Sequence, residues 1–365
     1  MMYPTLGIRE ILIELLAISK GDVSHFLVIL KGNEIVETYY ITGGTGHLGR
    51  NVVIELLKKE NINIVILVLK DDKHRNFIDP SKKITFVEGD VLDTESLDIF
   101  FNTKRSDINY CIHAAGLISI YKKRDEKVFR VNTEGTKNIV DLALKNKIDK
   151  FIYVSSVDCI TKPKKGEIVE PRYYDETMRG VYAQSKAIAS NYCLNSDLNT
   201  IIIHPSAILG REDPFGGPIN TALKMYLKGK LKTIVNGGYN LVDVRDVARG
   251  IVNAIDYGVN NENYILAGTN ITIKELIDLS SKITHLPSYK RCVSTNLVKI
   301  VSPILELYSK LTKKKPLFTA YSMDCLKQNY NYSSEKAKNE IHYTITPIEE
   351  TLKDTFEFLK SDFSN

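Results

Sequence analysis

Short apolar runs alternate with amphipathic stretches along most of the chain. The run Ile64–Leu69 is apolar without interruption, which is typical of a strand buried on both faces of its sheet. Other runs of this kind occupy residues 39–41, 84–87, 110–113, 151–154 and 200–203. Between the runs, stretches such as Val128–Leu144 and Val181–Leu194 place apolar residues at helical spacing. The alternation predicts an α/β fold with a doubly wound parallel sheet, because strand–helix–strand crossovers are right-handed.

The regular alternation loosens after Pro205. Prolines and glycines interrupt residues 211–240, and the tail from about residue 269 is mostly helical in pattern. We therefore predict two interleaved units. The main α/β domain would comprise residues 38–210 and 241–268, and a smaller, mostly helical lobe would comprise residues 211–240 and 269–365.

Two segments fall outside this alternation. Residues 1–37 precede the first predicted strand, and Glu10 and Glu14 lie where a signal peptide would need an uninterrupted apolar core. We interpret these residues as an N-terminal extension with no assigned role. The stretch Leu297–Leu311 is apolar at helical spacing and predicts a packed helix, with the wall of a lipophilic pocket or a membrane-facing surface as alternatives.

The stretch Thr42–Gly49 reads TGGTGHLG and directly follows the apolar run at residues 39–41. A strand that ends in closely spaced glycines and opens into a helix is suited to hold the pyrophosphate of a dinucleotide. The amides and the dipole of the helix then face the anion. The candidate cofactor-binding residues of this turn are Gly43, Thr45, Gly46, His47, Leu48 and Gly49.

A second group of candidates combines a serine pair with a tyrosine and a lysine. The run at residues 151–154 ends in Ser155 and Ser156, and Tyr182 and Lys186 lie one helical turn apart in a later helix. A lysine ammonium, together with an oxidised nicotinamide, favours the phenolate of a tyrosine whose unperturbed pKa is about 10. Tyr182 can then exchange a proton with a carbonyl or alcohol oxygen that a serine hydroxyl polarises. Because neighbouring strand residues face opposite sides, only one serine serves, and we predict Ser156.

Composition argues against several other classes of protein. A net charge of +5 on 365 residues, with scattered basic residues, predicts no nucleic-acid partner. The 5 cysteines are widely spaced and form no CxxC pair, which predicts reduced thiols, a cytoplasmic location and no metal site. His113 and His204 lie in apolar strand-like runs and are interpreted as core histidines. No apolar run approaches the roughly 20 residues that cross a bilayer, so we predict no membrane partner.

These motifs, in this order, resemble those of the extended short-chain dehydrogenase/reductases, the NAD-dependent epimerase/dehydratase superfamily. The likeness runs from about Tyr39 to Leu359 and is also carried by residues 89–90, 113–116, 131–138, 204–206 and 242–248. It implies a Rossmann-type sheet whose smaller lobe binds the substrate. It also implies roles for further residues: Asp90 and Val91 at the adenine, Ala114, Ala115 and Gly116 along the cofactor, Asn132 as a brace, Lys186 at the nicotinamide ribose and Pro205 behind the nicotinamide.

Cofactor preference is usually decided at the end of the second strand. A basic residue there pairs with a 2′-phosphate, whereas an acidic one accepts hydrogen bonds from a ribose 2′-hydroxyl. Lys70 stands where the flavonoid-reductase branch of the family carries a basic residue, and Arg50 is placed to help. Asp71 and Asp72 are interpreted as the start of a solvated loop. We therefore favour NADP(H), with NAD(H) as the alternative.

The substrate class is inferred from resemblance to one branch of the family. The tail, in Pro316–Thr319 and Ser333–Ala337, resembles the dihydroflavonol 4-reductase and 3β-hydroxysteroid dehydrogenase branch. Nucleotide-sugar epimerases of the family usually carry an arginine and then an asparagine at the sixth strand, and His204–Ser206 lacks both. We predict an oxidoreductase that interconverts a ketone and an alcohol on a fairly apolar small molecule.

Two other functions stay open as alternatives. One is a nucleotide-sugar epimerase/dehydratase that uses the same serine, tyrosine and lysine. The other is a non-catalytic NADP-sensing regulator, against which the intact Tyr182 and Lys186 count. The family resemblance also implies a homodimer that pairs through the helix of these two residues and the long helix before the fifth strand.

Overall fold

The computed structural model describes residues 35–78, 81–119, 125–231, 233–289, 291–298 and 320–361. Three features of the sequence reach beyond these ranges. Residues 1–34 of the N-terminal extension, residues 299–311 of the apolar stretch and the tail motif Pro316–Thr319 lie outside the described residues.

Seven parallel strands form the central sheet, in the order β10-β6-β5-β4-β1-β2-β3. The predicted apolar runs form its first six strands: β1 (Glu37–Thr42), β2 (Ile62–Val68), β3 (Ile84–Glu88), β4 (Ile108–His113), β5 (Lys150–Val154) and β6 (Thr200–Pro205). The seventh, β10 (Glu262–Leu266), pairs with β6. The predicted Rossmann-like α/β fold is therefore confirmed. Because the chain leaves β3 at one edge and re-enters beside β1 as β4, the order of the strands reverses between β1 and β4.

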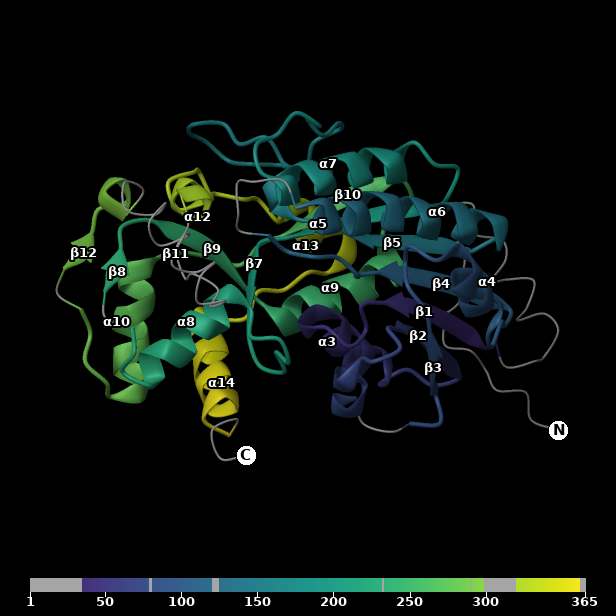
Figure 1. Ribbon diagram of the computed structural model, residues 1–365, viewed down its shortest axis with the longest axis horizontal. Coiled ribbons are helices and arrows are strands. Elements are labelled where there is room, and N and C mark those ends of the chain that lie inside the picture. The colour runs from purple at the N-terminus through teal and green to yellow at the C-terminus, as the bar shows by residue number, and fades with distance from the viewer. Residues whose placement is uncertain are drawn as a thin grey trace.

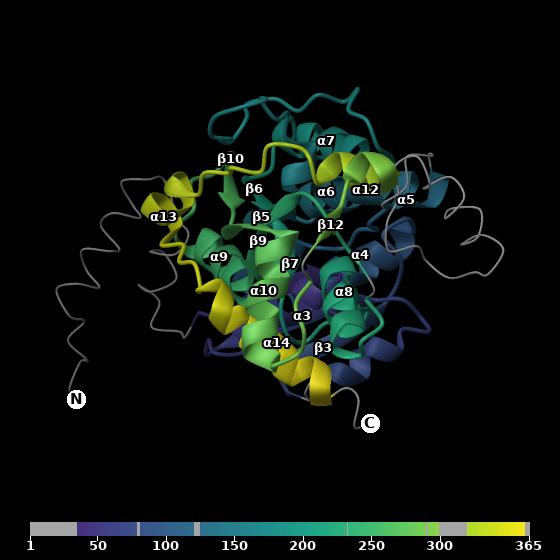
Figure 2. The same cartoon turned by 90° about the vertical axis from the view of Figure 1, so that its left-hand side faces the viewer.

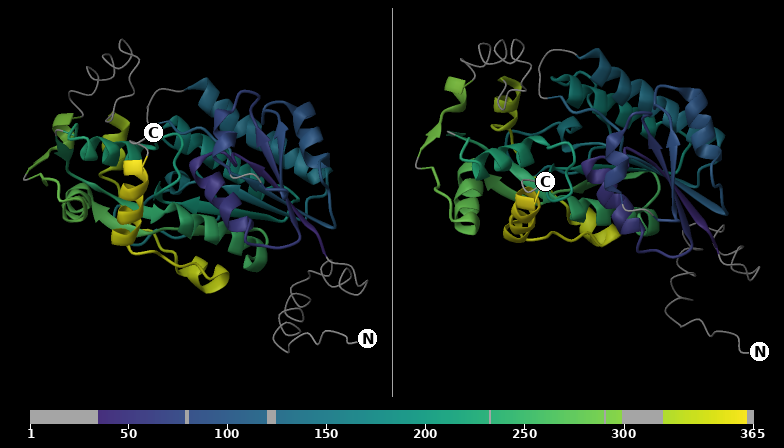
Figure 3. Two further views of the ribbon diagram at one scale, coloured as in Figure 1. Left: turned by 90° about the horizontal axis from the view of Figure 1, so that it is seen from below. Right: turned by 60° about the horizontal axis from the view of Figure 1, so that its bottom comes forward.

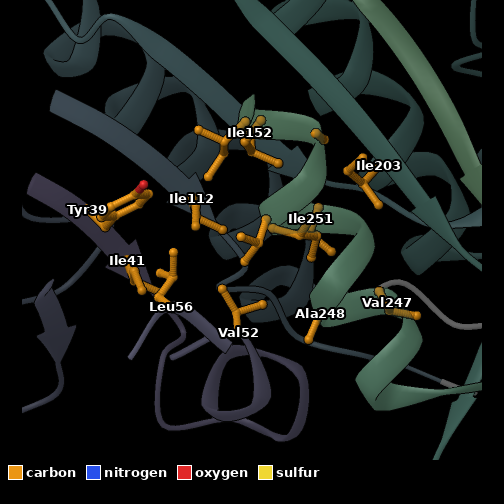
Figure 4. Close-up of a cluster of buried hydrophobic side chains, with 14 of the residues drawn as sticks. Tyr39, Ile41, Val52, Leu56, Ile112, Ile152, Ile203, Val247, Ala248 and Ile251 are labelled. Carbon is orange, nitrogen blue, oxygen red and sulfur yellow. The ribbon is translucent and has the colours of Figure 1, made fainter. Parts of the chain in front are cut away.

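Two helices, α3 (His47–Leu56) and α9 (Val244–Tyr257), pack against each other on one face of the sheet. Val52 and Ile251 from these helices meet Ile41 and Ile152 from the strands in one buried cluster (Figure 4). Each of these side chains is fully buried, which stabilises the fold by about 1.5–3 kcal/mol per side chain. This packing fixes α3, the helix that opens from the glycine turn.

The helices α4 (Thr94–Asn102), α5 (Glu126–Arg130), α6 (Thr136–Lys145) and α7 (Val181–Leu194) cover the opposite face (Figure 1). The single helix expected over Val128–Leu144 is divided in the structure. Residues Val131–Gly135 form one turn of π-helix between α5 and α6. A π-turn adds a residue to the helical repeat and redirects the side chains around it, and such turns are frequent at functional sites.

A smaller C-terminal region packs against the end of the sheet (Figure 3). A three-stranded sheet combines β7 (Ala207–Leu209), β9 (Gly238–Asp243) and β11 (Thr269–Thr272), and a second small sheet pairs β8 (Ile234–Val235) with β12 (Cys292–Val293). Its helices are α8 (Pro218–Leu227), α10 (Ile273–Thr284), α12 (Ala320–Cys325) and α14 (Ile348–Ser361), of which α8, α10 and α14 face the viewer in Figure 2. The region therefore contains strands as well as the expected helices.

The tail of the chain returns to the main sheet before it ends. The helix α13 (Glu335–Ile341) packs on α9 and β10, and its Ala337 and Ile341 belong to the same buried cluster as Val52. The division at residue 269 remains a prediction, since α13 follows that residue but packs against the sheet. Among the helices of the described ranges, none combines the length and the apolar character that a bilayer crossing requires.

Candidate active site

The glycine turn joins β1 to α3 at the carboxyl end of β1, a central strand, next to β4 where the strand order reverses. Gly43 has φ of +71°, and a Cβ there would lie 2.7 Å from the backbone nitrogen of Ala115. A Cβ on Gly49 would lie 2.1 Å from the carbonyl oxygen of Gly43. Within the described ranges no side chain caps the N-terminus of α3 at Gly46, so its first amides are free to meet an anion. The turn therefore fits a dinucleotide pyrophosphate.

The segment after β4 closes against this turn. The backbone amide of Ala115 donates to Thr42 Oγ1 at 3.2 Å, and the amide of Ala114 donates to the Thr42 carbonyl at 3.1 Å. A Cβ on Gly116 would lie 3.3 Å from both Asn132 Oδ1 and Lys186 Nζ. The structure thus brings the predicted cofactor residues of β1 and β4 next to the predicted catalytic lysine.

Ser156 and Tyr182 lie in contact at the carboxyl end of β5. The Ser156 hydroxyl is near enough to the Tyr182 hydroxyl to lower its pKa, and Ser156 Oγ accepts from the amide of Asp158 at 3.1 Å. Ser155 turns the other way, where its Oγ lies 2.8 Å from Ser190 Oγ on α7. The alternation of the strand therefore places the predicted Ser156 at the tyrosine and its neighbour in the interior.

Lys186 lies one turn along α7 and is almost completely buried. Its Nζ donates to the carbonyl of Val154 at 2.8 Å and lies 4.8 Å from the ring centre of Tyr153. Burial lowers the pKa of Lys186 to about 8, because the interior disfavours the ammonium. Lys186 is therefore a weaker base and a more readily deprotonated cation than a lysine in water.

Tyr182 has the opposite shift. Burial raises its pKa well above the usual value, and the Asp158 carboxylate raises it further, while the hydrogen bond with Ser156 lowers it. The sequence predicted that Lys186 would favour the phenolate. In the protein alone burial prevails, so Tyr182 is a neutral hydroxyl at physiological pH and is ready to donate a proton.

Asn132 holds the site together from the π-turn. Its Nδ2 donates to the carbonyl of Leu117 and to Ser185 Oγ, both at 3.0 Å, and its Oδ1 accepts from the amide of Leu117 at 2.8 Å. The side chain thereby ties the segment after β4 to α7, next to Lys186. This is the bracing position that the family resemblance implies for Asn132.

A buried polar network behind Ser156 was not found from the sequence. His204 Nδ1 lies 3.3 Å from the Ser156 carbonyl, and its Nε2 lies 2.7 Å from the hydroxyl of Tyr174. Burial lowers the pKa of His204 to about 3, so the ring is neutral. The core interpretation of His204 holds, but only the fold shows that this core residue touches the backbone of the candidate catalytic serine. The second core histidine, His113, lies between Thr42 and Thr136 at 2.6 and 3.0 Å.

The end of β2 differs from the sequence-based expectation. Lys70 is exposed past the strand, but Asp72 is not part of a solvated loop. Its carboxylate accepts from Thr45 Oγ1 at 2.6 Å and from the amide of His74 at 2.9 Å. Arg50, placed by the sequence to help bind a phosphate, instead forms an ion pair with Glu212 at 2.8 Å. The side chains of Asp72 and Arg50 are therefore both held by residues that are distant in the sequence.

The other predicted cofactor residues lie around the same edge. Asp90 caps its own turn by accepting from the amide of Leu92 at 2.9 Å, and Val91 is buried against Gly135 of the π-turn. His47 opens α3, and its Nε2 lies 2.9 Å from the carbonyl of Arg211. The remaining members, Leu48 and Pro205, pack in α3 and end β6 respectively.

The hydroxyl of Ser206, next to Pro205, supports a bound polar group. This side chain is buried, and among the described residues its Oγ has no hydrogen-bond partner. A buried hydroxyl without a partner costs about 1–3 kcal/mol, which a ligand amide or hydroxyl would recover. The residues of this edge therefore fit a nicotinamide dinucleotide.

A cavity of about 550 Å³ opens at the start of α7, where Ala183 lines it but Tyr182 does not, and we call it the α7 cavity. It lies between residues 158–164 after β5, residues 175–183 around the start of α7, and residues 327–329 after α12. Ile160, Met178 and Ala183 form an apolar part of its wall, and charged and neutral polar side chains form most of the rest. The cavity provides room for a small molecule next to the candidate catalytic residues.

Comparison with known proteins gives matches over most of the chain. Residues 39–267 match the family described as the NAD dependent epimerase/dehydratase family. A putative dihydroflavonol 4-reductase of Synechocystis is 27% identical over 349 residues, which cover 93% of this chain and 98% of the relative. The mouse sterol-4-alpha-carboxylate 3-dehydrogenase, decarboxylating, is 26% identical over 358 residues, which cover 88% and 91%.

Solved structures agree in fold. The crystal structure of gox2253 superposes with a TM-score of 0.76 at 25% identity and covers 90% of this chain and 99% of its own. A UDP-glucose 4-epimerase of Thermotoga maritima superposes with a TM-score of 0.71 at 20% identity and covers 90% and 100%. The second likeness is one of fold alone.

Proposed function

Because the chain belongs to the NAD-dependent epimerase/dehydratase family, we propose that it is an oxidoreductase that interconverts a ketone and an alcohol. The observation that carries the proposal is that Ser156 lies at Tyr182, with buried Lys186 one turn away on α7 and with the α7 cavity adjoining them at Asp158 and Ala183. The names of the flavonoid and sterol relatives support an apolar carbon skeleton for the substrate.

Each residue of the trio has a defined part in the proposed reaction. A bound nicotinamide cofactor supplies or accepts the hydride at the substrate carbon. The neutral Tyr182 hydroxyl donates its proton to the carbonyl oxygen during reduction, and the Ser156 hydroxyl donates a hydrogen bond to the same oxygen. Lys186, whose Nζ donates to the Val154 carbonyl, places a positive charge beside Gly116, one of the predicted cofactor-binding residues. In oxidation the same groups act in reverse order.

The cofactor belongs to the NAD(P) class, and we propose NADP(H) as the preferred form. Lys70 supports this choice, because it is exposed at the end of β2 and makes no ion pair with another residue that the structure describes. A free ammonium at this place can pair with a 2′-phosphate. The nearby carboxylate of Asp72 favours NAD(H) instead. The Lys70 substitution described below distinguishes a preference for NADP(H) from a preference for NAD(H).

A nucleotide-sugar epimerase is the second candidate, supported by the fold of the Thermotoga maritima enzyme and by the polar lining of the α7 cavity. A reductase consumes NAD(P)H in step with substrate, whereas an epimerase recycles its cofactor and shows no net consumption. An NADP-sensing regulator would bind the cofactor and do neither.

The test measures NADPH and NADH consumption on a panel of aromatic, steroidal and aliphatic ketones, with UDP-sugars as a separate arm. Wild type is compared with Tyr182→Phe, which keeps the ring and removes the proton. We expect the variant to lose about 100- to 10,000-fold in kcat and to keep its cofactor affinity. Activity that survives in Tyr182→Phe would contradict the mechanism. Interconversion of UDP-sugars without net consumption of NAD(P)H would establish the epimerase.

A further inference from the structure

We propose that the substrate carries an anionic group, a carboxylate or a phosphate, which the cations Arg179 and Lys164 bind in the α7 cavity. The inference rests on the proposed function in one respect: it takes the α7 cavity as the substrate site. It adds a charge requirement that the predicted apolar substrate does not have.

The α7 cavity adjoins the candidate catalytic residues through Asp158 and Ala183. Asp158 lines the cavity, and its backbone amide donates to Ser156 Oγ at 3.1 Å. Ala183, which also lines the cavity, follows Tyr182 on α7. A molecule that fills the cavity therefore lies beside the residues next to Ser156 and Tyr182 and extends toward residues 327–329.

Two of the three chain segments that enclose the cavity, the loop after β5 and residues 327–329, are joined to each other. Asn329 Nδ2 donates to the carbonyls of Pro163 at 3.2 Å and Gly166 at 2.7 Å. Residue Ile168 of the same loop also exchanges backbone hydrogen bonds with the strand-like segment around Tyr332. In Figures 1 and 2, α12 lies beside the loop that passes over α7. The wall of the cavity is thus a defined structure built from both parts of the chain.

Charged residues make up 6 of the 14 lining residues, and cations outnumber carboxylates among them. Of the described residues that line the cavity, four are cationic and two are carboxylates. The Asp158 carboxylate pairs with Lys162 Nζ at 3.3 Å, and the Asp175 carboxylate accepts from the amide and the hydroxyl of Thr177 at 2.8 and 2.6 Å. Lys162 also donates to Gln328 Oε1 at 3.0 Å, so its ammonium is already bound to two residues of the cavity wall.

The remaining cations lack a counter-charge. Arg179 and Lys164 form no hydrogen bond and no ion pair with any residue in the described parts of the chain. The Lys327 ammonium donates to the neutral side chain of Asn296 and forms no ion pair with a residue that the structure describes. A guanidinium and an ammonium that face one concave space attract an anion, and the guanidinium can hold two of its oxygens at once. Both side chains are exposed, and they line the same cavity as Asp158, whose amide donates to Ser156 Oγ.

The experiment uses three ketones of one skeleton: 4-acetylbenzoate, its methyl ester and 4-acetylphenyl phosphate. Reduction is followed with wild type, Arg179→Gln, Lys164→Gln and the control Lys165→Gln, an exposed neighbour outside the cavity lining. We expect wild type to prefer at least one anion over the ester. Arg179→Gln should lower the ratio of acid to ester kcat/KM by about tenfold, the value of one charge-assisted hydrogen bond, through KM. The control should keep the ratio.

Calorimetric binding of the same compounds separates this proposal from the proposed function. Anion binding that weakens in Arg179→Gln, without turnover of any ketone, would support the anion site and reject the oxidoreductase. The proposal is overturned if the ester binds and reacts as well as both anions, if neither anion binds, or if Arg179→Gln leaves the ratio unchanged. Preference for the phosphate compound or for the carboxylate identifies which anion the substrate carries.

Discussion

Replacing Gly43 by alanine tests whether the glycine turn is shaped by its contact with the segment after β4. The new Cβ would lie 2.7 Å from Ala115 N and 2.8 Å from the Ala114 carbonyl carbon, and both are backbone atoms that no rotamer change can move. The positive φ of +71° costs an alanine about 1–2 kcal/mol. Displacing the packed backbone adds about 1–3 kcal/mol of overpacking.

Gly229 provides the matched control. Its φ is +62°, and no heavy atom of the described structure lies within 4 Å of an added Cβ. Gly229→Ala therefore carries the cost of the left-handed backbone without the collision. The difference between the two variants isolates the contact with Ala114 and Ala115.

Urea unfolding and a fluorescence titration with NADPH measure the two consequences. We expect Gly43→Ala to lose about 1–3 kcal/mol more free energy of unfolding than Gly229→Ala. If binding has to restore the displaced turn, cofactor affinity falls by about 5- to 150-fold, whereas Gly229→Ala binds as wild type. Equal stability and equal affinity in the two variants would refute the close approach of the turn to β4.

Three further predictions concern the lysines and the assembly. Lys186 loses its proton at about pH 8 in the folded protein but near pH 10 in the unfolded chain, so between these values the unfolded state binds more protons. As the pH rises through this window, the free energy of unfolding of wild type should increase by up to about 1.4 kcal/mol per pH unit relative to Lys186→Met. A difference between the two proteins that does not change with pH in urea titrations would contradict the lowered pKa. Lys70→Glu should raise the KM for NADPH by about tenfold and spare NADH, and equal loss for both cofactors would reject Lys70 as the selective residue. Light scattering should give twice the mass of one chain, whereas a monomer would exclude pairing through α6 and α7.

The periodicity of the sequence predicts the main sheet because its strands are buried on both faces. Runs such as Ile64–Leu69 therefore carry a strong signal, and six of the seven strands follow from it. In the small sheet, β7 and β11 give no such signal, because these strands are short and partly exposed. The π-turn at Val131–Gly135 also has no signature in the spacing of apolar residues, since one extra residue in a turn hardly changes the pattern.

The candidate site divides in the same way. Ser156 follows from strand alternation, and Tyr182 and Lys186 follow from helical spacing, because these relations are local. The bond between Thr45 and Asp72, and the ion pair of Arg50 with Glu212, join residues that are remote in the chain. No spacing rule reports such contacts. For the same reason the cations of the α7 cavity look like ordinary surface charges until the fold brings them together.

Burial shifts the pKa values of Tyr182 and Lys186 in opposite directions, and these shifts favour reduction over oxidation. It raises the pKa of Tyr182 and lowers that of Lys186 to about 8, so at neutral pH the tyrosine is neutral and the lysine remains a cation. In this state the tyrosine can give a proton but cannot take one. Oxidation of an alcohol needs the phenolate, which requires a further positive charge near Tyr182 to offset burial and the Asp158 carboxylate. An oxidised nicotinamide carries such a charge and a reduced one does not. We therefore expect reduction to need only the protein's own charges, and oxidation to depend more steeply on pH.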